Sequence, residues 1–257
     1  MSTTILVTGG TGTLGRHVVP LLRAAGREVR VLSRRGGAPA DGVEYVACDL
    51  IEGEGIDAAL AGVGTVLHLA GGPKGDVVAT RNLVRAAAGA GVKHLVYISV
   101  IGADRIPLGY FRAKAGAERA VAESGVPWTT LRAAQFHDLA LTVAEKMGRL
   151  PVVPALGGLR WQPVDARDVA ERLVELALGE AAGRVRDLAG PGVYGLHELV
   201  LDHVRARGGR RRPALPVRLP GRVGRAYRAG ANLALDGADR GGRTWEAFLE
   251  ERVGGGR

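Results

Sequence analysis

The feature that most constrains the fold of this 257-residue chain is a regular alternation of short apolar runs with segments of helical periodicity. The runs are rich in β-branched residues and lie at residues 4–9, 28–34, 43–49, 65–71, 94–100 and 128–133. Between them, helices are predicted near residues 14–26, 56–61, 77–91, 113–125 and 136–147. The helix at 77–91 is expected to bury Val78, Leu83, Val84 and Ala87. Strands that alternate with helices form a parallel sheet covered on both faces. The chain is therefore predicted to be an α/β protein with a doubly wound parallel sheet.

A glycine-rich segment, VTGGTGTLGRHVV, connects the first strand to the first helix. Its glycines fit both GxxGxxG and GxGxxG spacing. Glycine permits a tight turn, lets a pyrophosphate approach the backbone and allows the helix to pack closely on the sheet. The free N–H groups of the helix N-terminus then face the anion. Because of its place between a strand and a helix, the segment predicts a dinucleotide site formed by Gly9, Gly10, Thr11, Gly12, Thr13, Leu14 and Gly15.

The end of the second strand, VLSRR, indicates which dinucleotide binds. NAD sites usually carry an acidic residue about 20 residues after the glycines, where it accepts hydrogen bonds from the ribose. This chain has Ser33, Arg34 and Arg35 there instead. Two guanidinium groups can form charge-assisted bonds to a 2′-phosphate, so we expect NADP(H) as the cofactor. The alternative is a pair of arginines in a surface loop.

Two further strand ends belong to the same predicted cleft, because ligands of such sheets bind outside the carboxyl ends of the strands. Asp49, beside Leu50 in ACDL, is placed either to accept a hydrogen bond from the adenine amino group or to cap its own loop. Ala70 and Gly71 in HLAGG lack bulky side chains and allow a close approach of the cofactor.

The segment HLVYISVIGADRIPLGYFRAK predicts a strand, a loop and the start of a helix. Tyr110 and Lys114 are four residues apart, so both point to the same side of the helix. Reduction of a carbonyl needs a proton donor, and a nearby ammonium lowers the pKa of a phenol. A serine hydroxyl at the strand end can polarise the carbonyl. We therefore predict Tyr110, Lys114 and Ser99 as catalytic residues; the alternative is a half-buried aromatic and a solvated lysine that only begin a helix.

Composition excludes several other classes of protein. The net charge of +9 is concentrated in residues 202–257, which hold 13 arginines and 6 acidic residues. Their basic segment RARGGRRRPALPVRLPGR has no interleaved aromatics and fits no recognisable nucleic-acid motif. We therefore do not expect a nucleic-acid partner. The single Cys48 allows no internal disulfide and makes a poor metal site, so no metal is expected. No apolar run approaches the roughly 18 residues of a membrane span, and the N-terminus has no basic region of a signal peptide, so a cytoplasmic location is expected.

The segments TGGTGTLG, CDL, HLAG, YISV and YFRAK resemble the short-chain dehydrogenase/reductase superfamily. More narrowly, YISVIGADRIPLGYFRAKAGAERAVAESGVPWTTLRAAQFHD with QPVDARDVA is similar to the atypical, NmrA-like branch of NAD(P)H-binding proteins. The resemblance implies a Rossmann fold, NADP(H) bound near the glycine turn and Arg34, and an active site of Ser99, Tyr110 and Lys114. The interval from Ser99 to Tyr110 is shorter than in common short-chain reductases. Some relatives in this branch lack the tyrosine and bind cofactor without catalysis.

Within this fold we assign residues 1–131 to the NADP-binding Rossmann core. Residues 132–257 supply the remaining sheet elements, a small substrate-binding region and C-terminal helices, the whole chain forming a single compact unit. Helices are expected at 166–178, 195–207 and 244–252, with Asp165 and Asp168 as capping residues of the first. The pocket wall is predicted to be apolar and aromatic with a few polar groups: Gln135, Phe136, His137, Trp161 and Gln162, with Val153 and Leu156 nearby.

These expectations favour NADP(H)-dependent reduction of a carbonyl or quinone in a hydrophobic small molecule, by a monomer or a homodimer. Two alternatives stay open. A non-catalytic NADP(H) sensor would be expected to have a broken Tyr/Lys pair. A sugar-nucleotide epimerase or dehydratase usually has a larger substrate domain than the residues after 131 provide.

Overall fold

The computed structural model describes residues 4–39, 42–72, 74–210 and 212–254, which form two compact units that interleave along the chain. The first unit contains the described residues up to Ser99, then Gly109–Arg132 and Val169–Val185. The second unit contains Val100–Leu108, Ala133–Asp168 and the described residues from Arg186 onward. The sequence-based boundary after residue 131 falls near the end of the last long strand, whereas Val169–Val185 returns to the first unit because β9 (Gly183–Arg184) pairs with β6 (Trp128–Ala133).

The sheet of the first unit has the strand order β6-β5-β4-β1-β2-β3, and strands β1 to β5 are parallel. The remaining bounds are β1 Thr4–Thr8, β2 Val29–Ser33, β3 Val43–Ala47, β4 Val63–His68 and β5 His94–Val100. The order reverses between β1 and β4, which is where ligands of doubly wound sheets bind. The predicted fold class is confirmed.

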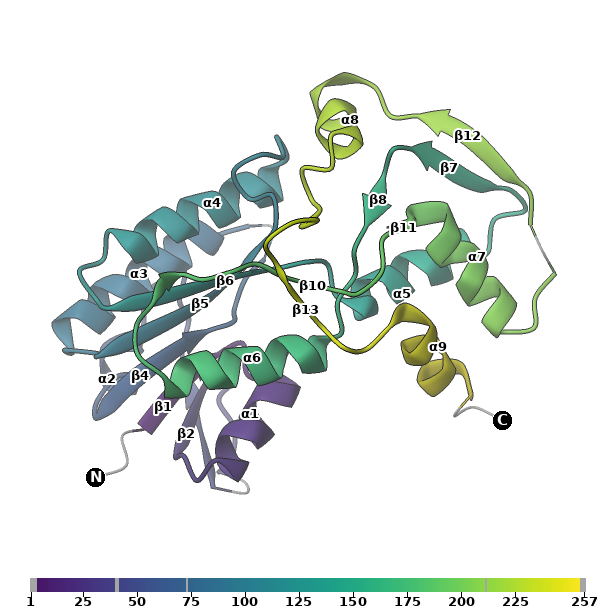
Figure 1. Ribbon diagram of the computed structural model, residues 1–257. Coiled ribbons are helices and arrows are strands. Elements are labelled where there is room, and N and C mark those ends of the chain that lie inside the picture. The colour runs from purple at the N-terminus through teal and green to yellow at the C-terminus, as the bar shows by residue number, and fades with distance from the viewer. Residues whose placement is uncertain (1–3, 40–41, 73, 211, 255–257) are drawn as a thin grey trace. The chain divides into compact units, whose positions relative to one another are not determined.

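Helices cover both faces of this sheet. Figure 1 shows α1 (Gly15–Ala24) and α6 (Ala166–Leu178) on one face, and α3 (Asp76–Gly89) and α4 (Gly109–Ala122) on the other. The short α2 (Ile56–Ala59) packs into the same apolar cluster as α3. Leucine and valine side chains of the strands and helices form this cluster and exclude water from it, which stabilises the layered arrangement.

The buried face of α3 differs in one position from the face that the sequence predicted. Leu83, Val84 and Ala87 are buried as expected, but Val78 is 47% exposed. Asp76 and Thr80 are buried instead, because they share a helix face with Leu83 and Ala87 through spacings of four, three and four residues. The prediction that Val78 is buried was wrong. The Asp76 carboxylate lies on the buried face instead, at the start of α3.

The second unit is built around α5 (His137–Met147), α7 (Leu196–Ala206) and α9 (Trp245–Gly254), whose apolar side chains share one cluster. Short paired strands accompany them: β7 (Val153–Gly157) with β12 (Ala214–Arg218), β8 (Arg160–Trp161) with β11 (Tyr194–Gly195), and β10 (Leu188–Ala189) with β13 (Asp239–Arg240) (Figure 1). Neither β12 nor α8 (Gly221–Arg228) was predicted. All of β12 is exposed and it contains Pro216, so no burial pattern marks it as a strand.

Candidate active site

The glycine turn after β1 is packed too closely for side chains. Gly9 has a positive φ of 69°, and a Cβ there would lie 2.8 Å from the backbone nitrogen of Ala70 at the end of β4. A Cβ on Gly15 would lie 2.4 Å from the backbone of Gly10. The turn, the start of α1 and the end of β4 therefore meet with their backbones exposed to a ligand at the point where the strand order reverses. This is the cradle that a pyrophosphate requires.

The end of β2 presents two arginines. The Ser33 hydroxyl donates to the carbonyl oxygen of Gly36 at 3.0 Å and so closes the turn that contains Arg34 and Arg35. Both arginines are exposed. The geometry leaves the two guanidinium groups free to meet a ligand from solvent, whereas Ser33 acts within the turn.

The end of β3 shows that Asp49 caps its own loop. Its Oδ1 atom accepts hydrogen bonds from the backbone N–H groups of Ile51, at 2.8 Å, and Glu52, at 3.3 Å. The neighbouring Leu50 is half-buried and its carbonyl accepts from Asn82 at 3.0 Å. The capping alternative for Asp49 is thus present in the structure, and contact of Asp49 or Leu50 with adenine stays a prediction.

Lys114 is buried within a set of polar groups that the sequence did not reveal. Its Nζ atom lies 3.4 Å from Oδ2 of Asp76, and it donates to the Tyr97 hydroxyl at 3.1 Å and to the Ile98 carbonyl at 3.4 Å. A Cβ on Gly71 would lie 2.6 Å from the same Nζ. The ammonium therefore sits directly beside a residue predicted to contact the cofactor. The one available signal for Asp76 was an acid at a helix start, four residues before the buried Thr80 and seven before the buried Leu83.

Tyr110 and Ser99 complete the predicted catalytic set. Tyr110 is 42% exposed, while Ser99 is buried and its hydroxyl has no hydrogen-bond partner among the described residues. Desolvation, followed by the Asp76 carboxylate, raises the pKa of Tyr110. The expectation that Lys114 lowers this pKa is wrong for the structure, because the ammonium is directed to Asp76, Tyr97 and Ile98.

A second buried polar network lies under the same strand ends. The ring of His68 bonds to the Thr8 hydroxyl at 2.7 Å and to the Thr80 hydroxyl at 3.0 Å, and it stacks on Tyr97 with ring centroids 5.3 Å apart. The Thr8 hydroxyl in turn accepts from the backbone N–H of Ala70 at 3.1 Å. Burial, together with the Lys114 charge, lowers the pKa of His68 to about 3. A neutral His68 thus ties the end of β1 to the end of β4.

The residues predicted to contact substrate belong to the second unit. Gln135, Phe136 and Trp161 are half-buried and keep some exposed surface. His137 has none: its ring contacts the rings of Trp245 and Phe248, and its Nε2 atom contacts the carbonyl of Pro163 at 3.1 Å. Gln162 is also buried, and binds the backbone of Gly190 and Ala234. His137 and Gln162 therefore belong to the interior of the second unit.

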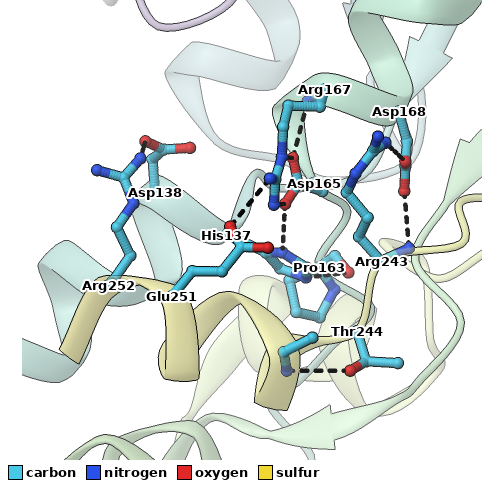
Figure 2. Close-up of polar contacts among 11 residues, drawn as sticks. His137, Asp138, Pro163, Asp165, Arg167, Asp168, Arg243, Thr244, Glu251 and Arg252 are labelled. Atoms are coloured by element: carbon cyan, nitrogen blue, oxygen red, sulfur yellow. Dashed lines mark hydrogen bonds and ion pairs between the residues drawn. The ribbon is translucent and has the colours of Figure 1, made fainter. Parts of the chain in front are cut away.

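Figure 2 shows the ion pairs and hydrogen bonds that connect α9 with the residues near His137. Asp165 accepts from the backbone N–H of Arg167 at 2.8 Å, which confirms it as a cap of α6, and also binds the guanidinium. The same guanidinium reaches Glu251 at 2.9 Å. Asp168 binds the backbone and the guanidinium of Arg243, so the prediction that it caps the helix was wrong.

No group of His, Cys, Asp and Glu side chains among the described residues could hold a metal ion. None of the helices in the described ranges is long and apolar enough to cross a membrane. Cys48 is buried.

The fold and the glycine cradle define a protein that binds a nicotinamide dinucleotide. The chain belongs to the NAD(P)H-binding family, whose family model matches residues 9–178. Within it, the relatives agree with the predicted atypical short-chain dehydrogenase/reductase, NmrA-like branch. The predicted family and the NADP(H) cofactor are thereby confirmed.

Three known proteins are similar to this chain. A (4-alkanoyl-5-oxo-2,5-dihydrofuran-3-yl)methyl phosphate reductase of Streptomyces griseus is 37% identical over 73% of this chain and 68% of its own length. An NAD(P)H azoreductase of Xenophilus azovorans is 35% identical over 66% of this chain and 62% of its own length, so the chain spans less than two thirds of that relative. The NADPH-dependent quinone oxidoreductase of Escherichia coli, in a structure with NADPH, has a TM-score of 0.82 at 21% identity, covering 96% of this chain and 99% of that one. The predicted enzyme class, an NADPH-dependent reductase, is confirmed.

Proposed function

We propose that the chain reduces a carbonyl or quinone group of a hydrophobic small molecule, with Tyr110 as the proton donor. The observation that carries the proposal is the buried Lys114 ammonium beside Gly71, on the helix that also carries Tyr110 one turn earlier. The relatives named above are reductases of small organic molecules, which supports the same class of substrate.

The residues of the first unit suit the cofactor of this family. The backbone of the glycine turn would hold the pyrophosphate at the start of α1, and Arg34 with Arg35 would bind the 2′-phosphate. Lys114 would bind the nicotinamide ribose beside Gly71. When bound, NADPH supplies the hydride.

Tyr110 has the protonation state that a donor needs. Because its pKa is raised, the phenol keeps its proton at neutral pH. The phenol gives that proton to the oxyanion that forms on the substrate. The unpartnered Ser99 hydroxyl would donate to the same substrate oxygen. Gln135, Phe136 and Trp161 remain the proposed substrate contacts.

The test is NADPH oxidation with a panel of quinones and ketones, in the wild type and in Tyr110→Phe. The variant should lose about 100-fold or more in kcat while it keeps its affinity for NADPH, because general acid catalysis contributes that much. Tyr227→Phe, the same change in α8, is the matched control and should leave kcat unchanged. Unchanged kcat in Tyr110→Phe would exclude Tyr110 as the donor.

A non-catalytic NADP(H) sensor is the second candidate. It is favoured by the contacts of Lys114, whose hydrogen bonds go to Tyr97 and Ile98 rather than to the Tyr110 phenol. Tight NADPH binding with no turnover of any acceptor in the panel would support the sensor. A cytoplasmic location and a monomeric or homodimeric state stay predictions.

A further inference from the structure

A buried carboxylate and a buried ammonium from different helices face each other in the first unit. The side chains of Lys114 in α4 and Asp76 at the start of α3 are only 6% and 2% exposed. Oδ2 of Asp76 lies 3.4 Å from Nζ and has no hydrogen-bond partner among the described residues. An acid so deeply buried is costly unless a positive charge compensates it, so the pair exists as a unit.

We infer that Asp76 is a positioning residue that holds the Lys114 ammonium charged and fixed beside Gly71. Of the three groups that surround Nζ, the Tyr97 hydroxyl and the Ile98 carbonyl are neutral acceptors, and only Asp76 brings a full negative charge. The purpose of this arrangement rests on the proposed function, because a neutral lysine would not bind the nicotinamide ribose as an ammonium.

The need for a carboxylate follows from burial. Desolvation lowers the pKa of Lys114, and the Asp76 charge acts against it and raises the pKa again. Desolvation likewise raises the pKa of Asp76, and Lys114 lowers it. Each group therefore favours the charged form of the other, and removal of the carboxylate leaves a buried lysine that loses its proton more readily.

The other titratable groups near Lys114 cannot replace Asp76. The ring of His68 in β4 and the phenols of Tyr97 in β5 and Tyr110 in α4 are held neutral by their shifted pKa values. Glu118 in α4 is paired with Arg132 of β6 at 2.6 Å. The carboxylate that balances the ammonium is thus Asp76.

Gly71 completes the arrangement from the side of the strand end. A Cβ there would lie 2.6 Å from Nζ and 3.3 Å from Oδ1 of Asp76. Its φ is not in the left-handed region, so space and not backbone conformation calls for glycine. An alanine at this position would push the ammonium away from its place against the carboxylate.

The titration of Lys114 tests the inference without any need for turnover. The chain contains only four lysines, Lys74, Lys93, Lys114 and Lys146, so NMR of lysine side chains labelled with ¹³C at Cε resolves few signals, and Lys114→Met identifies the one required. Asp76→Asn should lower the titration midpoint of Lys114 by about 1 to 3 pH units. Above the new midpoint, affinity for NADPH should fall by about tenfold or more, and it should recover at lower pH.

Asp57→Asn is the matched control, because Asp57 is an exposed acid in the first turn of α2 and should leave the midpoint unchanged. If Asp76→Asn does not fold, Gly71→Ala provides the second variant and should also lower the midpoint. An unchanged Lys114 midpoint in the folded variant overturns the inference. If Tyr110→Phe shows that Tyr110 is not the proton donor, the Lys114 titration still tests the role of Asp76. Failure of the proposed function and failure of this inference are therefore distinguishable.

Discussion

Replacement of Gly15 by alanine tests whether the turn after β1 is as tightly packed as cofactor binding requires. The new methyl carbon would lie 2.4 Å from the backbone of Gly10, whereas ordinary contact begins at 3.4 Å. The turn and the start of α1 must therefore separate by about 1 Å, and overpacking of this kind costs about 1–3 kcal/mol. For a chain of this size, each kcal/mol lowers Tm by about 2–4 °C, so we expect a loss of about 2–12 °C.

The assay combines thermal unfolding with NADPH binding followed by cofactor fluorescence. Gly15→Ala should weaken NADPH binding as well as lower Tm, because the displaced backbone N–H groups are the ones that meet the pyrophosphate. Gly89→Ala in α3 is the control: apart from its own helix backbone and chain neighbours, no atom of the described residues lies within 4 Å of the added Cβ, and the better helix propensity should stabilise the protein by about 0.5–1 kcal/mol. A Gly15→Ala variant with wild-type Tm and wild-type NADPH affinity would refute the reasoning.

Three further predictions concern other parts of the chain. Arg34→Ala should weaken binding of NADPH but not of NADH, measured by fluorescence titration, because only NADPH carries the 2′-phosphate; equal losses for both would remove that role. Burial lowers the pKa of His68 to about 3, so as the pH falls the unfolded state takes up a proton before the folded state does. The contribution of His68 to the free energy of unfolding, measured with urea, should therefore be fully present above about pH 6.5 and decrease by up to about 1.4 kcal/mol per pH unit below it. His68→Gln should remove the contribution of this one proton to the pH dependence of the unfolding free energy. An unaltered pH dependence would contradict the assignment of a neutral, buried His68. Trp245→Ala should cost about 3–5 kcal/mol in the same assay, because the fully buried ring packs on Phe248 and His137; a loss below about 1 kcal/mol would show that α9 is not held by this ring.

The strands and most helices of the first unit could be predicted because their signals are local. Alternating β-rich runs and helical spacings act within a few residues, and β5 and β6 lie where the sequence placed them. The start of α4 was predicted four residues too late, since Gly109 and Tyr110 are weak helix formers that the tertiary fold nevertheless includes in the helix.

The candidate site was only partly predictable for the same reason. The glycine turn and the Tyr110/Lys114 spacing are visible in short segments, but the partners of Lys114 are not. Asp76 and Tyr97 come from α3 and β5, and no spacing rule connects these positions with residue 114. Burial of His137 was likewise missed, because the rings that enclose it come from α9, more than 100 residues later.

The amino-acid sequence alone thus determined the order of strands and helices, the dinucleotide cradle and the choice of two arginines over an acid at the end of β2, since each depends on neighbouring residues. Only the tertiary structure decided which charge stands beside Lys114, which face of α3 is buried and how α9 is fastened. Those outcomes depend on which side chains are buried against one another, and these side chains come from segments that are distant in the sequence and meet only in the folded structure.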